Sequence, residues 1–195
     1  MKNSNKIILD LCGGTGSWSK PYKENGYDVR IITYPENDVR TYEPPKNVYG
    51  ILAAPPCTDF TIACNRLWKT KDNDGRTASS LSIVYAILDI IKQCNPNFHV
   101  IENPIGRLKN YLGRPKIIYC YSQFGCEYQK KVCLWGEFVP PMPLYSGTYV
   151  KELAKACGDD FYNLPIDYKA DHNKRAAQRS VTYPGFAYAF YEANK

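Results

Sequence analysis

The fold is decided by the stretch Lys6-Ile7-Ile8-Leu9-Asp10-Leu11-Cys12-Gly13-Gly14-Thr15-Gly16, near the start of the 195-residue chain. Its apolar first half predicts a buried strand at residues 6–11, and the glycines that follow predict a tight turn. Residues 17–24 then favour a helix that ends at Asn25-Gly26. A glycine-rich turn between a strand and a helix lets the backbone approach a ligand closely. Spacing alone leaves two interpretations open, a nucleotide-like cofactor site or a tight turn and nothing more.

Outward from this stretch, short apolar runs alternate with helical patterns. Further strands are predicted at residues 29–34, 49–54, 98–101, 117–124 and 131–138. Ser79 or Ser80 can cap a helix whose apolar stripe contains Leu81, Val84, Leu88 and Ile91. This alternation predicts an α/β fold, a mainly parallel sheet with helices on both faces, in a single domain over residues 1–195. Residues 139–179 lack the pattern and are predicted to form a short irregular insertion, with one helix candidate at residues 150–156.

Composition and charge restrict the class of protein. The chain has 44% hydrophobic and 23% charged residues, as a folded protein does. No apolar run approaches the roughly 20 residues of a membrane-spanning helix. The N-terminus also lacks the apolar region of a secretion signal, so we expect a cytoplasmic protein without a membrane partner. The net charge of +6 suits a polyanionic partner, although many basic proteins bind no nucleic acid.

Eight cysteines are many for this length. In a protein without an export signal they are expected to be reduced thiols. No pair has Cys-x-x-Cys spacing, and His99 and His172 lie far apart in the sequence. Cys120, Cys126 and Cys133 are fairly close, but no second ligand cluster accompanies them. Because structural zinc uses paired close ligands, we predict no metal, and for most cysteines the role of a small buried side chain.

Two polar motifs follow predicted strands, at the edge where a parallel sheet binds its ligands. Pro55-Pro56-Cys57 comes after residues 49–54; the prolines restrict where the cysteine points, and a thiol is an intrinsically strong nucleophile. Glu102-Asn103-Pro104 comes after residues 98–101 and would share the crevice with Cys57. Taken singly, Cys57 also fits a buried structural cysteine, and Glu102 a solvated loop acid. The coincidence of three motifs at three strand ends favours a site.

Over nearly its whole length the chain resembles the DNA cytosine-5 methyltransferases, in particular their compact forms from phages and prophages. Asp10-Leu11-Cys12-Gly13-Gly14-Thr15-Gly16 looks like the family's S-adenosylmethionine loop, Pro55-Pro56-Cys57 like its nucleophile motif, and Glu102-Asn103-Pro104 like its Glu-Asn-Val motif. Gln123-Phe124-Gly125 and residues 129–133 look like its Tyr-Gly…Gln-x-Arg-x-Arg motif. Residues 179–187 resemble the closing segment that completes the cofactor pocket. Each motif is modest alone, but five in family order are a strong signal.

The resemblance implies a Rossmann-like methyltransferase fold, S-adenosylmethionine as cofactor and DNA as partner. The catalytic roles that it implies fall to Cys57, Glu102 and Lys131. The implied cofactor-binding residues are Asp10, Leu11, Cys12, Gly13, Gly14, Thr15, Gly16, Trp18, Glu36, Asp38, Pro55 and Thr182. The implied substrate-binding residues are Pro56, Thr58, Arg66, Lys69, Asn103 and Gln129.

The reaction that the resemblance implies is covalent catalysis. Cytosine C5 is too weak a nucleophile to take a methyl group directly, so the Cys57 thiolate adds to C6 while Glu102 hydrogen-bonds and protonates N3. C5 then attacks the sulfonium methyl, a base or water removes the C5 proton, and Cys57 leaves. A dry pocket favours a neutral Glu102. A base stacked in a duplex must first be flipped out.

The chain also departs from the family's pattern. Tyr34-Pro35-Glu36 stands where an acid usually holds the ribose hydroxyls, so Glu36 acts from a displaced position or the ribose is held differently; Asp38 matches the position near the adenine amino group. The two arginines appear as Lys131 and Cys133, which lack the bidentate fork. Residues 139–179 are too short for a target-recognition insertion, so we expect low sequence selectivity, or selectivity read from residues 61–77 or lent by a protein partner.

Two alternatives to a DNA-modifying enzyme stay open. One is an inactive relative that binds cofactor or DNA without turnover. The other keeps the chemistry but acts on RNA or on a free pyrimidine nucleotide, a substrate that would suit the short recognition region.

Residues 61–77 are expected to form a loop directly after the nucleophile. Its basic residues Arg66, Lys69, Lys71 and Arg76 would meet phosphates, and Trp68 would fill the gap that a flipped base leaves. Against this, the acidic residues Asp59, Asp72 and Asp74 partly cancel the charge, and charged loops are usually solvated. The basic run His172, Lys174, Arg175 and Arg179 leaves contact with nucleic acid equally open.

Overall fold

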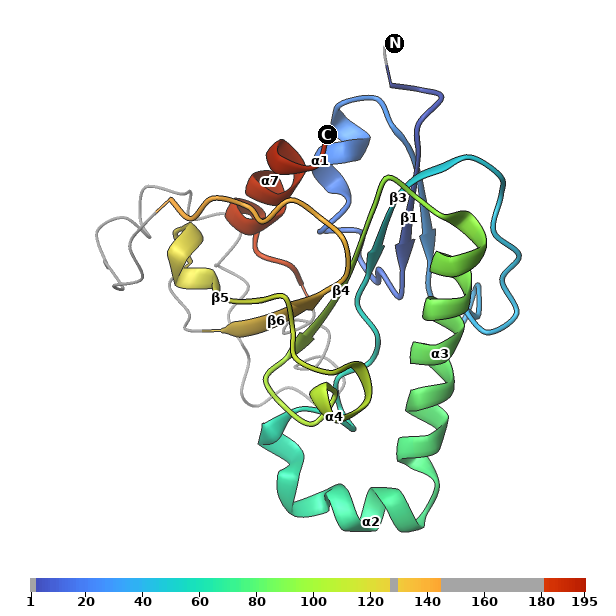
Figure 1. The fold of residues 1–195 in the computed structure, drawn as a ribbon, viewed down its shortest axis with the longest axis vertical. Coiled ribbons are helices and arrows are strands. Elements are labelled where there is room, and N and C mark those ends of the chain that lie inside the picture. The colour runs from blue at the N-terminus through green and yellow to red at the C-terminus, as the bar shows by residue number, and fades with distance from the viewer. Residues whose placement is uncertain (1–2, 127–129, 145–180) are drawn as a thin grey trace.

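The computed structural model describes residues 3–126, 130–144 and 181–195. Six strands form one sheet in the order β2-β1-β3-β4-β6-β5 (Figure 1). Their bounds are β1 Ile7–Leu11, β2 Asp28–Ile32, β3 Val48–Ala53, β4 Phe98–Pro104, β5 Ile117–Cys120 and β6 Lys131–Trp135. β1 pairs in parallel with β2 and β3, and β3 with β4, whereas β6 is antiparallel to both β4 and β5. Only β6 is therefore reversed, and the predicted mainly parallel α/β sheet is confirmed.

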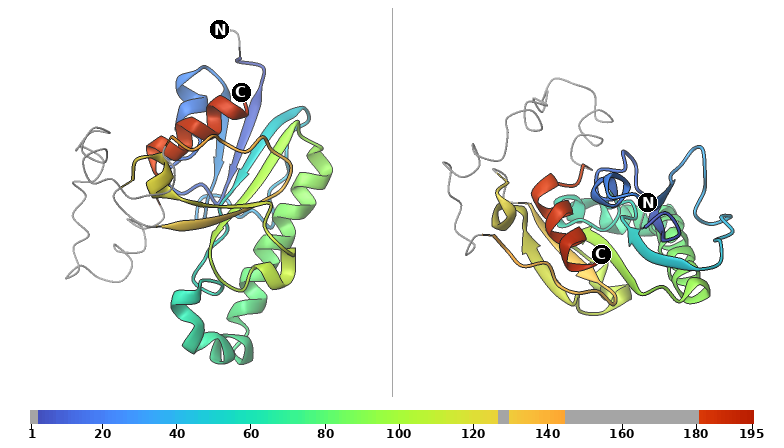
Figure 2. Two further views of the ribbon diagram at one scale, coloured as in Figure 1. Left: turned by 60° about the vertical axis from the view of Figure 1, so that its left-hand side comes forward. Right: turned by 90° about the horizontal axis from the view of Figure 1, so that it is seen from above.

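Helices cover both faces of the sheet, as predicted (Figure 2). Alternate residues of each strand point to opposite faces. Leu9, Ile51 and Ile101 pack with residues of α3 (Arg76–Cys94) on one face. Ile8, Leu52 and Val100 belong to an aromatic core on the other face, together with residues of α1 (Lys20–Glu24) and α7 (Pro184–Ala193). Most residues of β1, β3 and β4 are buried between the two cores. The ends of these strands are therefore the places where side chains can reach a ligand.

The largest correction concerns residues 61–77, which are not a loop. A 3-10 helix η1 (Ile62–Leu67) is followed at once by α2 (Trp68–Asn73), and α3 begins at Arg76, ahead of the predicted caps Ser79 and Ser80. Gly75 precedes α3 with φ +83. This left-handed conformation favours glycine and lets the chain turn from α2 into α3 within two residues.

Other predicted boundaries shift by a few residues. The first helix is limited to Lys20–Glu24, with turns before it. β4 continues to Pro104 because it pairs with the reversed strand as far as Val132. The predicted strand 117–124 ends at Cys120 and passes into a 3-10 helix, η2 (Tyr121–Phe124), whose Gln123 side chain accepts a hydrogen bond from the Cys120 N–H at 2.7 Å. A short helix α4 (Lys109–Leu112) follows β4.

Several predictions lie outside the described residues. They are the helix at residues 150–156, most of the irregular insertion 139–179, and the basic run His172 to Arg179. Within the described part of the chain, none of the helices combines the length and apolar character needed to cross a bilayer.

Candidate active site

Three strand ends bring the predicted motifs together. Leu11 on β1 pairs with Ala53 on β3, which in turn pairs with Ile101 on β4, so the next residue along each strand lies at the same edge. β1 and β3 end there, whereas β4 continues to Pro104 in its pairing with β6. The glycine turn (residues 12–16) follows β1, and the Pro-Pro-Cys motif follows β3. This edge is where open parallel sheets bind ligands.

Cys57 and Glu102 lie close enough to affect each other's ionisation. The thiol of Cys57 is partly buried; burial and then the charge of Glu102 raise its pKa, and Lys130 opposes them. Burial raises the pKa of Glu102 too, again opposed by Lys130. The Oε1 atom of Glu102 is shielded from solvent and has no hydrogen-bond partner among the residues that the structure describes. A half-buried carboxyl group with a raised pKa, and with one oxygen that lacks a partner in the described chain, therefore lies near the candidate nucleophile.

Asn103 ties the two motifs to each other. Its side chain is fully buried, and its Nδ2 donates a hydrogen bond to the Pro55 carbonyl at 3.0 Å. Its Oδ1 is buried without a partner in the described residues. Pro55 is buried, whereas Pro56 and Thr58, predicted to bind substrate, are exposed on either side of Cys57. Asn103 thus holds the end of β4 against the segment after β3. Of the residues predicted to bind substrate in these two motifs, Pro56 and Thr58 are exposed and Asn103 is buried.

The nearby cation is Lys130 rather than the predicted Lys131. The ammonium of Lys130 lies 5.1 Å from the centre of the Tyr121 ring, and its charge lowers the pKa values of both Cys57 and Glu102. Lys131 is exposed and pairs with Cys120 at the sheet edge. Strand alternation explains the difference: residue 130 shares its face with Val132 and Leu134, which belong to the same core as Val100, and residue 131 points the other way. This period-two pattern was the available signal for Lys130. Gln129 lies outside the described residues.

The glycine turn is built around the buried carboxyl group of Asp10. Ser19 Oγ donates to Asp10 Oδ2 at 2.5 Å, while Oδ1 has no partner in the described chain. Burial raises the pKa of Asp10 to about 6, against the opposing hydrogen bonds from Ser19. A Cβ on Gly13 would lie 2.4 Å from Asp10 Cγ, so only glycine fits there. Gly14 has φ +53 and nothing within 4 Å of its Cβ position, which leaves the tip of the turn, with Thr15, open.

Asp38 lies beside this turn, and Glu36 is exposed on the segment before it. Burial raises the pKa of Cys12 to about 12, with added contributions from the charges of Asp10 and then Asp38. Both carboxylate oxygens of Asp38 accept hydrogen bonds from Arg40, which lower its pKa to about 2. Asp38 is therefore an ionised acid near the glycine turn whose oxygens are already engaged by Arg40.

The closing segment reaches the glycine turn as the resemblance implies. The Thr182 backbone N–H donates to Ser17 Oγ at 2.9 Å, although 165 residues separate them. A side-chain hydrogen bond also joins Thr182 to Tyr121, whose ring lies beneath Lys130. Thr182 thereby connects the candidate cofactor turn with the Glu102 region.

Trp18 and Leu11 are core residues rather than exposed ligand contacts. Trp18 is 3% exposed, and its ring packs against Phe190 at 5.5 Å and Phe186 at 6.0 Å between ring centres. Leu11 is fully buried. The aromatic side chains of α7 cover the Trp18 ring, and its predicted contact with a cofactor stays a prediction.

The predicted phosphate contacts after Cys57 divide into two groups. Arg66 and Lys69 are exposed on η1 and α2. Lys71 is 5% exposed, and its ammonium binds Asp59 Oδ1 at 2.9 Å and the Thr58 carbonyl at 2.5 Å. The prediction for Lys71 is therefore wrong, since its charge is used internally. Trp68 is likewise held in the fold, with the guanidinium of Arg107 5.0 Å from its ring centre, which contradicts the predicted role as a wedge.

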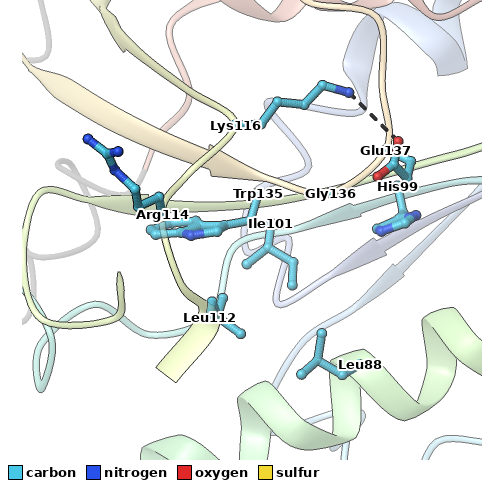
Figure 3. A pocket seen from close by; sticks show the side chains of 9 residues that line it. All are labelled: Leu88, His99, Ile101, Leu112, Arg114, Lys116, Trp135, Gly136 and Glu137. Atoms are coloured by element: carbon cyan, nitrogen blue, oxygen red, sulfur yellow. Dashed lines mark ion pairs between the residues drawn. The ribbon is translucent and has the colours of Figure 1, made fainter. Parts of the chain in front are cut away.

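A hollow of about 540 Å³ lies on the α3 side of the sheet, away from these groups (Figure 3). Leu88, Ile101, Leu112 and Trp135 form its apolar part, and Arg114, Lys116, His99 and Glu137 surround it. None of the predicted site residues lines it. No three His, Cys, Asp or Glu side chains in the described segments gather closely enough to hold a metal ion.

The chain was compared with protein families, with curated proteins and with solved structures. No protein-family model matches the chain. Over 125 residues it is 28% identical to the type II methyltransferase M.DdeI of Desulfomicrobium norvegicum. The chain is similar to part of this type II methyltransferase. The match covers 52% of the chain but only 28% of M.DdeI, so the chain spans little more than a quarter of that protein's length.

A solved structure is also similar, namely that of a candidate DNA modification methyltransferase encoded within a prophage of E. coli. The TM-score is 0.42 and the identity 18%, over 68% of this chain and 46% of that one. The α/β architecture itself is given by the strand order and the two helical layers described above.

Proposed function

We propose that the chain is an S-adenosylmethionine-dependent DNA cytosine-5 methyltransferase in which Cys57 is the nucleophile and Glu102 the acid. The observation that carries the proposal is the pairing of these two groups at neighbouring strand ends. Burial raises the pKa of Glu102, its Oε1 has no hydrogen-bond partner among the described residues, and Cys57 is close enough for its pKa to respond to Glu102. A buried neutral acid beside a thiol is what addition to a pyrimidine ring requires.

The glycine turn fits S-adenosylmethionine in two respects. Its tip at Gly14 is open, and Asp10 Oδ1 beneath it is a buried acceptor without a partner in the described chain. The backbone of residues 12–16, with Asp38 beside Cys12 and Thr182 against Ser17, would hold the group. When bound, S-adenosylmethionine supplies an electrophilic methyl group. The turn and Cys57 both follow strands that end at the same sheet edge, which supports transfer of this methyl group to a base held by Cys57.

The residues of the chain perform the remaining chemistry. The sulfur of Cys57 forms a bond to C6 of cytosine, and the electron pair displaced from the C5–C6 double bond is stabilised because Glu102 donates its proton to N3. C5 can then take the methyl group. Loss of the C5 proton to a base or water expels Cys57, the N3 proton returns to Glu102, and the ring is restored. The cation of Lys130 favours the thiolate before the attack.

DNA is the favoured substrate because of the surface next to Cys57. Arg66 is exposed on η1, and Lys69 is exposed on α2. Ile62 and Leu67, both on η1, are 56% and 50% exposed. Exposed cations beside exposed aliphatic side chains fit a phosphate backbone and an opened base stack. We propose this surface as the DNA contact. Sequence selectivity beyond it would be supplied by a protein partner.

The test is transfer of labelled methyl groups from S-adenosylmethionine to three substrates: duplex DNA, RNA of the same sequence, and cytidine nucleotides. We expect label in DNA as 5-methylcytosine after digestion to nucleosides. Label in RNA or nucleotides alone would reassign the substrate. Label at N4 of cytosine or N6 of adenine would overturn the cytosine-5 chemistry. Binding of cofactor and DNA without transfer to any substrate would favour the inactive relative.

A further inference from the structure

A network of charged side chains joins the segment after Cys57 to the segment after Glu102. Arg107 is 6% exposed. Its Nε donates to the Asp59 carbonyl at 2.8 Å, its Nη1 to both oxygens of Asp72 at 2.8 and 3.0 Å, and its Nη2 to Thr77 Oγ1 at 2.6 Å. Lys71 adds its ion pair with Asp59. We call these five residues the Arg107 clamp.

The clamp reaches three different elements. Asp59 lies two residues after Cys57, Asp72 is on α2, and Thr77 is on α3, while Arg107 follows β4 by three residues. Thr77 Oγ1 also donates to Asp72 Oδ1 at 2.6 Å, so the two side chains that accept hydrogen bonds from Arg107 are bonded to each other. The two helices after the nucleophile are thereby fixed to the chain that leaves the Glu102 strand.

Backbone contacts continue the same junction up to the nucleophile. The Arg107 N–H donates to the Phe60 carbonyl at 2.8 Å, and the Ile62 N–H to the Ile105 carbonyl at 2.9 Å. A Cβ on Gly106 would lie 1.9 Å from the Phe60 oxygen, so the two chains could not lie this close with another residue there. The Cys57 carbonyl accepts from the N–H groups of Phe60 and Thr61 at 3.0 and 2.8 Å. The turn that begins at Cys57 is therefore the turn that Arg107 holds.

The burial of Arg107, Lys71 and Asp59, beside the more exposed Asp72, indicates a geometric role. Buried ion pairs add little net stability, because desolvation offsets their attraction, but they require one arrangement of the groups around them. Arg76 and Asp74 form a contrasting pair on the same stretch of chain. They are 53% and 39% exposed and only two residues apart, so this pair bridges no separate elements.

We propose that Arg107 is a positioning residue for the methyl transfer. It holds the Cys57 turn at a set distance from Glu102, so that the sulfur and the acid reach C6 and N3 of the same ring. The inference rests on the proposed function. Arg107 itself touches neither the reacting atoms nor the cofactor turn in the contacts described above. Its effect must therefore appear in the rate of the chemical step rather than in binding.

The test compares Arg107→Lys and Asp72→Asn with the control Arg30→Gln, whose exposed ion pair with Asp28 lies within β2. Lysine keeps the charge of Arg107 but cannot make its forked set of bonds. Because misplacement by about 1 Å can cost about 100-fold in rate, we expect Arg107→Lys to lower kcat about 30- to 100-fold, and Asp72→Asn about 5- to 10-fold. The Kd for S-adenosylmethionine and the KM for DNA should change less than about threefold. Arg30→Gln should match the wild type within about twofold.

Two further measurements separate positioning from folding. Asp72 is half-exposed, so Asp72→Asn stays informative if Arg107→Lys fails to fold. Hydrogen exchange at the amides of Phe60 and Thr61 should quicken in both clamp variants and stay unchanged in Arg30→Gln. Wild-type kcat in a folded Arg107→Lys, or equal losses in KM and cofactor Kd, would overturn the inference while leaving the proposed function in place. A wild-type chain that transfers no methyl group would overturn both.

Discussion

Cys12 follows β1 and Cys57 follows β3, so two thiols leave one edge of the same sheet and differ in the charges around them. Cys12 has Asp10 and Asp38 nearby, and burial with these two acids raises its pKa to about 12. The pKa of Cys57 is raised by burial and by Glu102, but Lys130 acts against both. A cysteine after a buried strand is therefore not sufficient for a nucleophile. The neighbouring charges select which thiol can ionise.

The acids beside the two cysteines also differ at neutral pH. Asp38, with a pKa of about 2, and Asp10, with a pKa of about 6, are both ionised there and keep Cys12 protonated. Glu102 is half-buried, and burial raises its pKa. When Glu102 is neutral, its contribution to the raised pKa of Cys57 disappears. The protonation that lets Glu102 donate to N3 thus also favours the Cys57 thiolate.

The largest expected effect is the loss of the nucleophile. Cys57→Ala should lower methyl transfer at least about 1,000-fold, because no sulfur remains to add to C6. Cys12→Ala should stay within about fivefold of the wild type. Both variants should bind S-adenosylmethionine nearly as the wild type does. Incorporation of labelled methyl groups and calorimetric binding measure the two properties. Undiminished transfer by Cys57→Ala would eliminate covalent catalysis.

The next effect concerns Glu102 and pH. The rate should rise with pH as Cys57 ionises and fall at higher pH as Glu102, whose pKa is raised, loses the proton that N3 needs. Glu102→Gln should be about 100-fold slower and should lose the falling limb, because an amide does not titrate. Rate profiles from pH 5 to 10 for both proteins test this. A falling limb that persists in Glu102→Gln would assign it to another group.

A smaller effect is expected at Lys130. Removing its charge in Lys130→Gln should raise the pKa of Cys57 and slow its alkylation by iodoacetamide about 5- to 10-fold at pH 8. Lys131→Gln is the matched control, since Lys131 is exposed and lies on the opposite face of the strand. Peptide mapping of the alkylated cysteine gives both rates. If the two variants slow alkylation equally, the charge near Cys57 is not specifically that of Lys130.

The smallest effect is on stability through Asp10. Its pKa is raised by burial to about 6, from 3.8, so the folded state loses stability as pH rises from about 4 to about 6. Asp10→Asn should remove this loss. The gain above pH 6 should be about 1 kcal/mol, less than the roughly 3 kcal/mol that two pKa units represent, because the hydrogen bond from Ser19 to a charged acceptor is also lost. Urea unfolding at pH 4 and pH 7 measures it; equal pH dependence in both proteins would contradict it.

The sheet could be predicted from the sequence because it depends on local patterns. The same patterns predicted that Cys57 and Glu102 lie near each other at one edge of the sheet. An apolar run followed by Gly or Pro indicates a strand end, and parallel pairing collects such ends at one edge. The choice of Lys131 over Lys130 failed because motif spacing was followed instead of the two-residue period of the strand. The apolar residues Val132 and Leu134 indicated this period, because they alternate with residues 131 and 133 and lie in the same core.

Other features depended on contacts between distant parts of the chain. Trp18 is buried by Phe186 and Phe190, which lie more than 160 residues away in sequence. Lys71 is neutralised by Asp59, and α2 is held by Arg107, a residue 35 positions beyond its partner Asp72. Such pairings leave no periodic signal, so a run of polar residues was interpreted as a solvated loop. Burial of the charges, rather than the sequence pattern, determines their roles.

The most direct measurement is the mapping of a covalent adduct. The protein is incubated with S-adenosylmethionine and duplex DNA in which 5-fluorocytosine replaces cytosine, so that the proton loss needed to release the enzyme is blocked. The adduct is then digested and sequenced by mass spectrometry. We predict a single modified peptide, with the methylated pyrimidine on the sulfur of Cys57 and none on Cys12. An adduct on Cys12, or methylation of ordinary DNA with no trapped adduct, would contradict the account.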